Sequence, residues 1–123
     1  MIWLKQRGLS QKTIEDLLPY IPETMNELPV DDFYDADSIM NSDRWFYWPD
    51  QTRFVLVGQC PNGDGVAIDT EINPGCIYYI SHDLLHDKSI EDIIVRVADS
   101  PSDYVKKRSL DDFTWDFWEA IST

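Results

Sequence analysis

The sequence predicts an α+β fold in which a mainly antiparallel β-sheet meander packs against helices at both ends of the chain. Runs of aromatic and β-branched residues follow one another through the middle of the chain, joined by short turn motifs with no helical pattern between them. Helical spacing of apolar residues occurs near both ends instead. The 123 residues, 43% of them hydrophobic, suit one domain with a sizeable core.

The first predicted helix is short and amphipathic. Its apolar residues recur at the i, i+3, i+4 and i+7 positions of one helical face: Ile14, Leu17, Leu18 and Ile21. Ser10 or Thr13 can cap its start with a side-chain oxygen. Pro19 and Pro22 end it, because proline lacks the N–H donor that a helix interior requires. The stretch that follows, 23–50, is expected to be irregular and acidic.

The sheet is predicted over residues 45–98, between an N-terminal part (1–44) and C-terminal helices (99–123). Its strands are expected at 45–48, 53–57, 66–68, 76–80 and 93–97. Asn62-Gly63 supplies the positive φ angle of a tight hairpin. Asn73-Pro74-Gly75 holds proline and glycine in the order that a type II turn requires. Sequential strands joined by such short turns are expected to pair antiparallel.

Two helices are predicted after the sheet. Ser100 offers a capping oxygen, and Pro101 suits the first helical turn. A helix is therefore expected over 101–107. Asp111 or Asp112 then opens a terminal helix. The apolar face of that terminal helix is expected to consist of Leu110, Phe113, Phe117 and Ile121.

Charge is the strongest compositional signal for function. Ten lysine and arginine residues oppose 23 aspartate and glutamate residues, which gives a net charge of −13. The stretch 13–50 is dense in acidic residues and holds Arg44 as its single base. The negative electrostatic potential of such a chain repels nucleic acid and anionic lipid, so neither is expected as a direct partner. A cationic partner is favoured instead. The alternative is that the acidity only keeps the chain soluble.

The lack of a recognisable targeting signal and the two expected free cysteines favour a cytoplasmic protein. Residues 1–8 lack the apolar core of a secretory signal. No stretch of the sequence approaches the roughly 20 apolar residues of a membrane span. Cys60 and Cys76 are expected to be free, partly buried thiols, because the cytosol is reducing.

Sequence motifs for a metal or a cofactor are weak. His82 and His86 stand at i and i+4 and could share a metal on a helix, but the glutamate that follows the first histidine of a zincin motif is missing. The alternative is a surface segment that follows a strand. Residues 62–65 hint at a calcium loop, yet the ligand spacing of an EF-hand is missing and a hairpin turn is favoured. We expect neither a cofactor nor a metal.

Binding is favoured over catalysis. The sequence has no G-x-S-x-G nucleophile motif, no Walker loop and no dinucleotide glycine pattern. An enzyme that uses paired carboxylates or the two histidines is the least favoured hypothesis, because 23 acidic residues form close pairs by chance.

Aromatic residues are candidates for anchoring a protein partner, since Trp and Tyr supply a large contact area at low entropy cost. The candidates are Trp45, Tyr47, Trp48 and Trp115. Trp115 is the most favoured for exposure, because it points away from the apolar face of the terminal helix. The alternative is that these residues belong to the core, as most tryptophans in small domains do.

Several features of the second half of the chain stand in an order typical of one family. A strand at 54–58 is followed by a Gly-Asp turn, Gly63-Asp64. The next strand ends in an aspartate, Asp69. A tyrosine-rich strand then closes on a Ser-His pair, Ser81-His82. An Ala-acid-Ser step, Ala98-Asp99-Ser100, opens a helix with an aromatic residue on its first turn.

On these features the chain resembles the SUKH superfamily over roughly residues 45–108, about half of its length. The aromatic residue on the first turn of the helix is Tyr104. The resemblance implies a non-catalytic α+β domain with a mainly antiparallel sheet and helices packed on it. Many bacterial members look like immunity proteins, which bind and neutralise a cognate toxin. Others, including a fungal cell-wall regulator, act as interaction hubs.

The leading hypothesis is therefore a cytoplasmic immunity-type protein that blocks a cationic toxin, possible targets including a basic nuclease. The acidic residues expected to steer association are Asp31, Asp32, Asp35 and Asp37. The apolar anchors expected near them or on the terminal helix are Trp45, Trp48 and Trp115. The alternative is a regulatory adaptor that binds a host protein.

Overall fold

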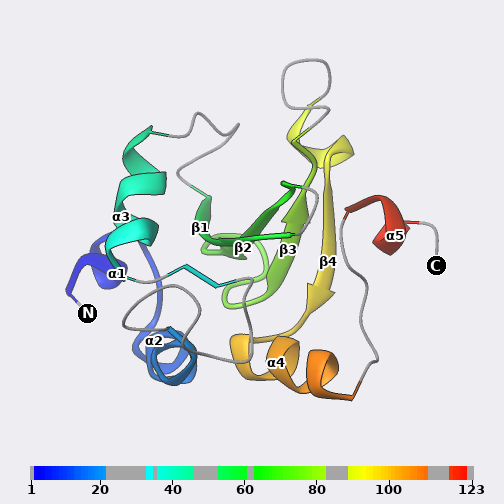
Figure 1. Cartoon of the computed structure of the whole chain (residues 1–123). Helices are drawn as coiled ribbons and strands as arrows, with labels where there is room; N and C mark the ends of the chain where they lie inside the picture. The colour runs from blue at the N-terminus through cyan, green and yellow to red at the C-terminus, as the bar shows by residue number, and fades with distance from the viewer. Residues whose placement is uncertain are drawn as a thin grey trace.

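Four β-strands, each paired with the next one in the sequence, form the centre of the structure (Figure 1). They are β1 (Phe54–Gln59), β2 (Gly65–Asp69), β3 (Ile77–Ile80) and β4 (Ile94–Ala98). Every pairing is antiparallel, which confirms the predicted α+β fold built on an antiparallel meander. The structure is a computed structural model that describes residues 2–21, 33–34, 36–45, 53–60, 63–82, 89–110 and 117–121.

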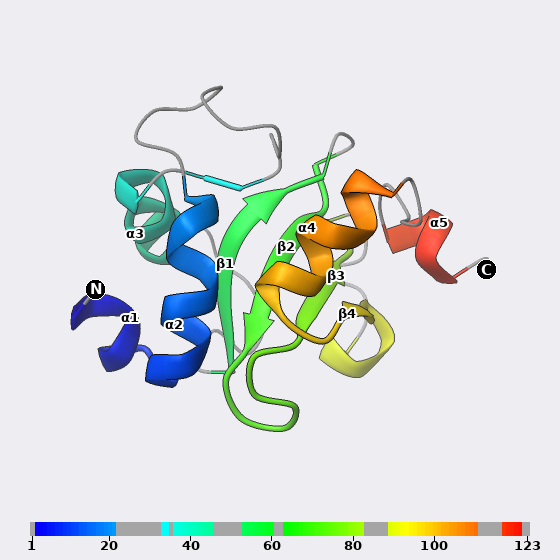
Figure 2. The ribbon, with the colours of Figure 1, turned by 90° about the horizontal axis from the view of Figure 1, so that it is seen from below.

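Helices lie at both ends of the chain, as predicted. They are α1 (Ile2–Gln6), α2 (Gln11–Leu17), α3 (Ala36–Trp45), α4 (Pro101–Ser109) and α5 (Phe117–Ile121), with the 3₁₀ helices η1 (Leu18–Tyr20) and η2 (Ile90–Asp92). α2 and α4 contact each other and lie across one face of the sheet (Figure 2). α3 packs against β1 and α5 packs against β4, the two outer strands of the sheet.

Strand residues divide alternately between two apolar clusters, because successive side chains of a strand point to opposite faces of a sheet. Val55 lies in the larger cluster together with Ile14 of α2 and Tyr104 of α4. Its neighbour Leu56 lies in the smaller cluster. Nearly all residues of β1, β2 and β3 are buried, so both faces of the sheet are covered.

α2 begins where the sequence predicted and ends slightly earlier. The Ser10 hydroxyl oxygen accepts a hydrogen bond from the Thr13 N–H at 3.2 Å, so Ser10 is the cap. The helix ends at Leu17 and continues as the 3₁₀ helix η1, which contains Pro19. Because the helical geometry changes there, Leu18 leaves the predicted apolar face and is 39% exposed.

Both predicted turns between strands are present. Gly63 has a φ angle of 99° and Gly75 one of 92°, in the region that glycine adopts without steric penalty. The Cys76 N–H donates to the Asn73 carbonyl at 3.1 Å and closes the turn that contains Pro74. These turns join the strands as the meander requires.

α4 also begins as predicted. The Ser100 hydroxyl oxygen accepts a hydrogen bond from the Asp103 N–H at 3.0 Å, which caps the helix. The helix then extends to Ser109, beyond the predicted end at 107.

The N-terminal part holds a helix where the sequence predicted irregular chain. α3 lies inside the stretch 23–50, and Trp45 ends this helix instead of opening a strand. Among the described side chains of α3, Ile39 alone is buried. A single buried residue produces no i, i+3, i+4 repeat, which is why the apolar pattern did not reveal the helix. The rest of the predicted strand, 46–48, lies outside the described residues.

The predicted apolar face of the terminal helix is wrong in part. Phe117 is buried at the start of α5, but Leu110 is 66% exposed and Ile121 is 49% exposed. Leu110 follows α4, where its N–H donates to the Lys106 carbonyl at 3.1 Å. Leu110 and Ile121 therefore lie at two different helices and do not share one face. Phe113 lies outside the described residues.

Gly75→Ala should destabilise the fold. An added Cβ would lie 3.0 Å from the Thr13 hydroxyl oxygen, and the positive φ angle disfavours any L side chain. We expect the free energy of unfolding to fall by about 1–3 kcal/mol, measured by urea denaturation. In a Thr13→Ala background, the part of this loss that comes from the clash with the Thr13 hydroxyl should disappear, while the part that comes from backbone strain should remain. Equal stability of Gly75→Ala and the wild type would contradict this account of the turn.

Candidate functional site

A buried carboxylate ties three segments of the chain together. Asp64 is fully buried (0% exposed) in the turn between β1 and β2. Its Oδ1 accepts the backbone N–H of His82 at 3.0 Å and lies 2.6 Å from the His82 Nδ1. Its Oδ2 accepts the backbone N–H of Phe117, at the start of α5, at 3.0 Å. This one side chain therefore joins the hairpin turn, the end of β3 and the C-terminal helix.

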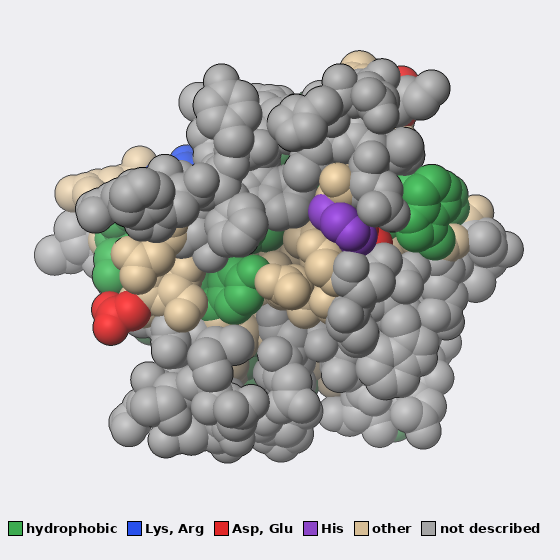
Figure 3. All heavy atoms as spheres, turned by 45° about the horizontal axis from the view of Figure 1, so that its top comes forward, with side chains coloured by type: hydrophobic (Ala, Val, Ile, Leu, Met, Phe, Trp, Pro, Cys, Tyr) green, Lys and Arg blue, Asp and Glu red, His purple; other side chains and the backbone are tan. Residues whose placement is uncertain are grey.

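The imidazole of His82 lies against Gly63 and reaches the surface. A Cβ added at Gly63 would be 3.6 Å from the Cε1 and Nε2 atoms of that ring. The His82 side chain is 38% exposed, and Figure 3 shows a histidine ring (purple) at the surface. The Gly-Asp turn and the Ser-His pair, which are distant in the sequence, therefore meet in space.

The residue types of a nucleophilic triad are present here, but its geometry is not. Ser81 is fully buried, and its hydroxyl has no hydrogen-bond partner within the described part of the chain. A triad requires a nucleophile that is bonded to the imidazole and open to the substrate. The contact between the His82 Nδ1 and Asp64 is the one that a triad has, but within the described residues no bond joins the buried Ser81 hydroxyl to this ring. As placed, these residues hold segments together and present no activated hydroxyl.

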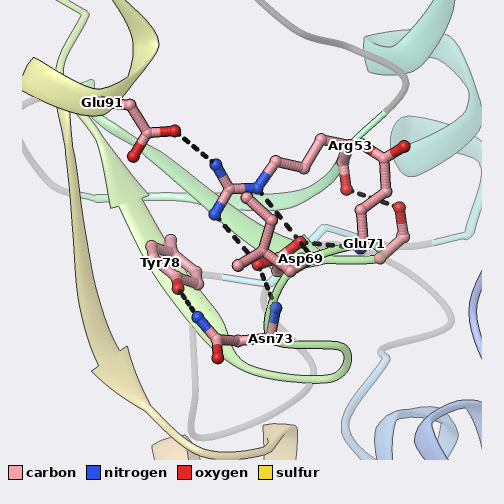
Figure 4. Close-up of polar contacts among 8 residues, drawn as sticks. Arg53, Asp69, Glu71, Asn73, Tyr78 and Glu91 are labelled. Atoms are coloured by element: carbon pink, nitrogen blue, oxygen red, sulfur yellow. Dashed lines mark hydrogen bonds and ion pairs between the residues drawn. The ribbon is translucent and has the colours of Figure 1, made fainter.

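A second buried network lies at the open end of the β1–β2 hairpin (Figure 4). Arg53 precedes β1, and its Nε and Nη2 atoms lie 3.3 and 3.2 Å from the two carboxylate oxygens of Asp69, at the end of β2. Its Nη1 donates to Glu91 at 3.0 Å. Arg53 and Asp69 are buried, whereas the Glu91 side chain is 67% exposed. The strongest contact of the network is therefore a bidentate ion pair shielded from water.

Asp69 also organises the turn that follows β2. The backbone N–H groups of Glu71, Ile72 and Asn73 donate to its carboxylate at 2.9, 3.2 and 2.8 Å. The Asn73 side chain donates in turn to the Tyr78 hydroxyl at 2.8 Å (Figure 4). The buried carboxylate thus meets a cation on one side and backbone donors on the other.

Hydrogen bonding outweighs burial in the electrostatics of this pair. Burial disfavours the charged carboxylate of Asp69, but the hydrogen bonds from Arg53 and from the backbone outweigh it and lower the pKa of Asp69 from its ordinary value. Burial likewise disfavours the charged guanidinium, but the hydrogen bond and the charge of Asp69 raise the pKa of Arg53. Both groups are therefore charged at neutral pH.

Cys60 and Cys76 are both buried and are not joined in a disulfide, as the sequence predicted. Burial is the main cause that raises the pKa of Cys76 above its ordinary value. A thiol that stays protonated is a poor nucleophile and a poor metal ligand. The Cys76 thiol is therefore suited to packing and not to chemistry at the surface.

An open cleft of about 570 Å³ lies between the start of α2, the turn at Pro74-Gly75 and the start of α4. Its charged lining consists of Lys12, Glu15, Asp16 and Asp99. Asp16 accepts the backbone N–H of Ser102 at 2.8 Å, so this amide of α4 is already used. Because carboxylates outnumber the lysine, the cleft does not suit a phosphate or another anion.

The structure places part of the predicted binding residues. Asp37 is exposed in the first turn of α3. Trp45 is the last residue of α3, but its side chain lies outside the description. The remaining predicted residues, Asp31, Asp32, Asp35, Trp48 and Trp115, and also His86, lie outside the described residues.

Three features of the structure were not predicted from the sequence. Trp118 is 43% exposed on α5, whereas the sequence favoured Trp115. The Arg53–Asp69 pair had a signal in the sequence, because an antiparallel hairpin brings the start of one strand next to the end of the following one. No pattern in the sequence indicated the bond between Asp64 and Phe117, because only the tertiary fold brings these two residues together.

No family model, no curated protein and no solved structure matches this chain. Within the described ranges, no group of three or more histidine, cysteine, aspartate and glutamate side chains could hold a metal ion. None of the helices in those ranges is long and apolar enough to cross a membrane.

Asp69→Asn should destabilise the fold strongly, because it leaves the Arg53 guanidinium buried beside a neutral side chain. Breaking a buried ion pair costs about 3–5 kcal/mol, so we expect a loss of roughly 3 kcal/mol in the free energy of unfolding. Glu91→Gln is the matched control, since it removes an exposed charge from the same guanidinium and should cost less than about 1 kcal/mol. Urea denaturation measures both losses. If both variants lost the same free energy of unfolding, the buried pair with Asp69 would not be the stronger of the two contacts of Arg53.

The contribution of Asp69 should also depend on pH. Its pKa is lower in the folded chain than in the unfolded chain, so its stabilisation is present above the unfolded value of about 3.9 and is lost as the pH falls through the folded value. The stability difference between the wild type and Asp69→Asn should therefore be constant near neutral pH and shrink below about pH 4. Urea denaturation across this range checks it. An unchanged difference at low pH would show that the pKa of Asp69 is not lowered.

Proposed function

We propose that this chain is a non-catalytic binding protein of the SUKH type, an immunity protein that neutralises a cationic toxin in the cytoplasm by covering its active site or a nearby surface. The observation that carries the proposal is the net charge of −13 in a chain of 123 residues. A field of this sign favours a basic protein as partner over nucleic acid or anionic lipid. Nuclease toxins fit this description, because proteins that bind nucleic acid carry basic surfaces.

The described surface supports this proposal, because exposed carboxylates lie on several separate elements. They include Glu15 on α2, Asp37 on α3, Glu71 after β2 and Asp92 in η2. A negative potential spread in this way attracts a basic protein during diffusion and raises its association rate. Rim charges act mainly on the association rate, whereas buried apolar anchors act on dissociation.

The positions of the motif residues also support a binding scaffold. Asp64 and His82 hold segments together, and the hydroxyls of Tyr79 and Tyr104 lie 3.1 Å apart in the core. Residues that carry the resemblance therefore maintain the fold. A fold whose shared residues are structural can present different surfaces to different partners, as an interaction domain requires.

Affinity capture from the source cell tests the proposal directly. The tagged full chain is used as bait at low and at high salt, and the bound proteins are identified by mass spectrometry. We expect one basic toxin domain whose retention falls at high salt, because charge attraction is screened. A single housekeeping protein would favour the regulatory adaptor instead. The absence of any partner at both salt concentrations would contradict the proposal.

The double variant Asp35→Lys, Asp37→Lys should slow association with the captured toxin about ten-fold at low salt, with a smaller effect at high salt. Dissociation should change little, because these charges steer and do not anchor. Stopped-flow association at several salt concentrations measures this. Glu15→Lys combined with Glu71→Lys makes the same change in net charge at exposed positions outside both α3 and the region of α5. If that control slows association equally, steering by the acidic run on and before α3 is wrong.

A further inference from the structure

One side of α5 presents apolar side chains to solvent, and the other side buries Phe117 in the protein. Trp118 is 43% exposed and Ile121 is 49% exposed, while Phe117 is only 2% exposed. Residues three positions apart lie on the same face of a helix, so Trp118 and Ile121 form one surface. Large exposed apolar residues elsewhere in the described ranges include Leu18 and Ile72, which lie on separate elements.

This surface is held in place by the interior of the protein. The Phe117 N–H donates to the fully buried Asp64, and Phe117 belongs to the larger apolar cluster. The Phe117 and Trp118 rings lie 5.4 Å apart at an angle of 83°, an edge-to-face contact. α5 also packs against β4, and it lies on the β4 side of the sheet in Figure 1. Trp118 and Ile121 therefore lie on a helix whose position is fixed by buried contacts. Such preorganisation lowers the entropy lost when a partner binds.

The acidic composition of the C-terminal segment favours a basic partner for this surface. The sequence 110–123 contains four acidic residues and neither lysine nor arginine. Glu91 and Asp92, both exposed, immediately precede β4, against which α5 packs. A chain of this net charge attracts arginine-rich proteins, and an exposed indole can in addition stack against the guanidinium. The surface therefore fits a basic protein face in which arginine flanks an apolar contact.

We propose that Trp118 and Ile121 of α5 form the docking face for the basic partner, with Trp118 as the main anchor. This inference rests on the proposed function, because it takes the partner to be a cationic protein. Tryptophan is enriched among the residues that dominate interface energetics, especially where a polar rim surrounds it. Asp64 is a positioning residue for this face, since it holds the helix that carries the anchor.

The first test uses an octa-arginine peptide as probe and the isotope-labelled full chain. In NMR titrations we expect the amide shifts to concentrate on α5 and its neighbours on β4, and the response to weaken several-fold in Trp118→Ala. Ile72→Ala is the matched control, since it also removes an exposed apolar side chain, and it should leave the response unchanged. Shifts spread evenly over the acidic surface, or the same response in Trp118→Ala, would overturn the inference.

The second test uses the basic protein that the capture experiment identifies. Trp118→Ala should weaken its binding about 30-fold, mainly through faster dissociation, while Trp118→Phe should restore part of the affinity. Ile72→Ala should stay within about two-fold of the wild type. Unchanged urea midpoints would show that Trp118→Ala remains folded, as its exposure predicts.

The outcomes separate the two proposals. If the wild type binds the basic protein and Trp118→Ala binds it equally well, the docking face is wrong while the proposed function stands. If the wild type captures no basic protein, the proposed function fails, and the docking face fails with it. If sedimentation shows a dimer of the chain that Trp118→Ala dissociates, the face is occupied by a second copy and the inference is overturned.

Discussion

Both faces of strands β1, β2 and β3 are buried, and this constraint decides where the chain can place charge in its interior. Successive residues of these three strands enter two different apolar clusters, so the strands offer almost no solvated side for a polar group. A buried charge without a partner is costly, and it is tolerated where hydrogen bonds or an opposite charge meet it. Arg53, Asp64 and Asp69 satisfy this condition at the ends of strands, where turns supply free backbone donors.

The two buried carboxylates perform different structural tasks. Asp69 closes the open end of the β1–β2 hairpin through Arg53 and shapes the turn that leads to β3. Asp64 lies in the turn at the other end of the hairpin and receives donors from the end of β3 and from α5. The hairpin is thus tied at both ends, and the position of the C-terminal helix depends on the conformation of a turn far away in the sequence.

This arrangement separates the interior from the surface. Asp64 and His82 hold segments of the chain together, and Ser81 is closed to solvent. Acidic side chains remain exposed on helices and turns around the sheet. The backbone N–H bonded to Asp64 belongs to Phe117, the residue next to the exposed Trp118, so the buried bond fixes the start of the helix that carries this side chain.

Local patterns in the sequence determined the fold class, the turns and the helix caps. Alternating apolar residues, Gly75 in a turn, and the hydroxyls of Ser10 and Ser100 act over a few residues, so their effects can be predicted without knowing the rest of the chain. α3 escaped prediction because Ile39 is its single buried residue among those described, and what buries it is packing against β1. Only the tertiary structure decided that Asp64 meets Phe117 and that Trp118 is exposed, because these contacts join residues far apart in the sequence and depend on how the chain folds back on itself.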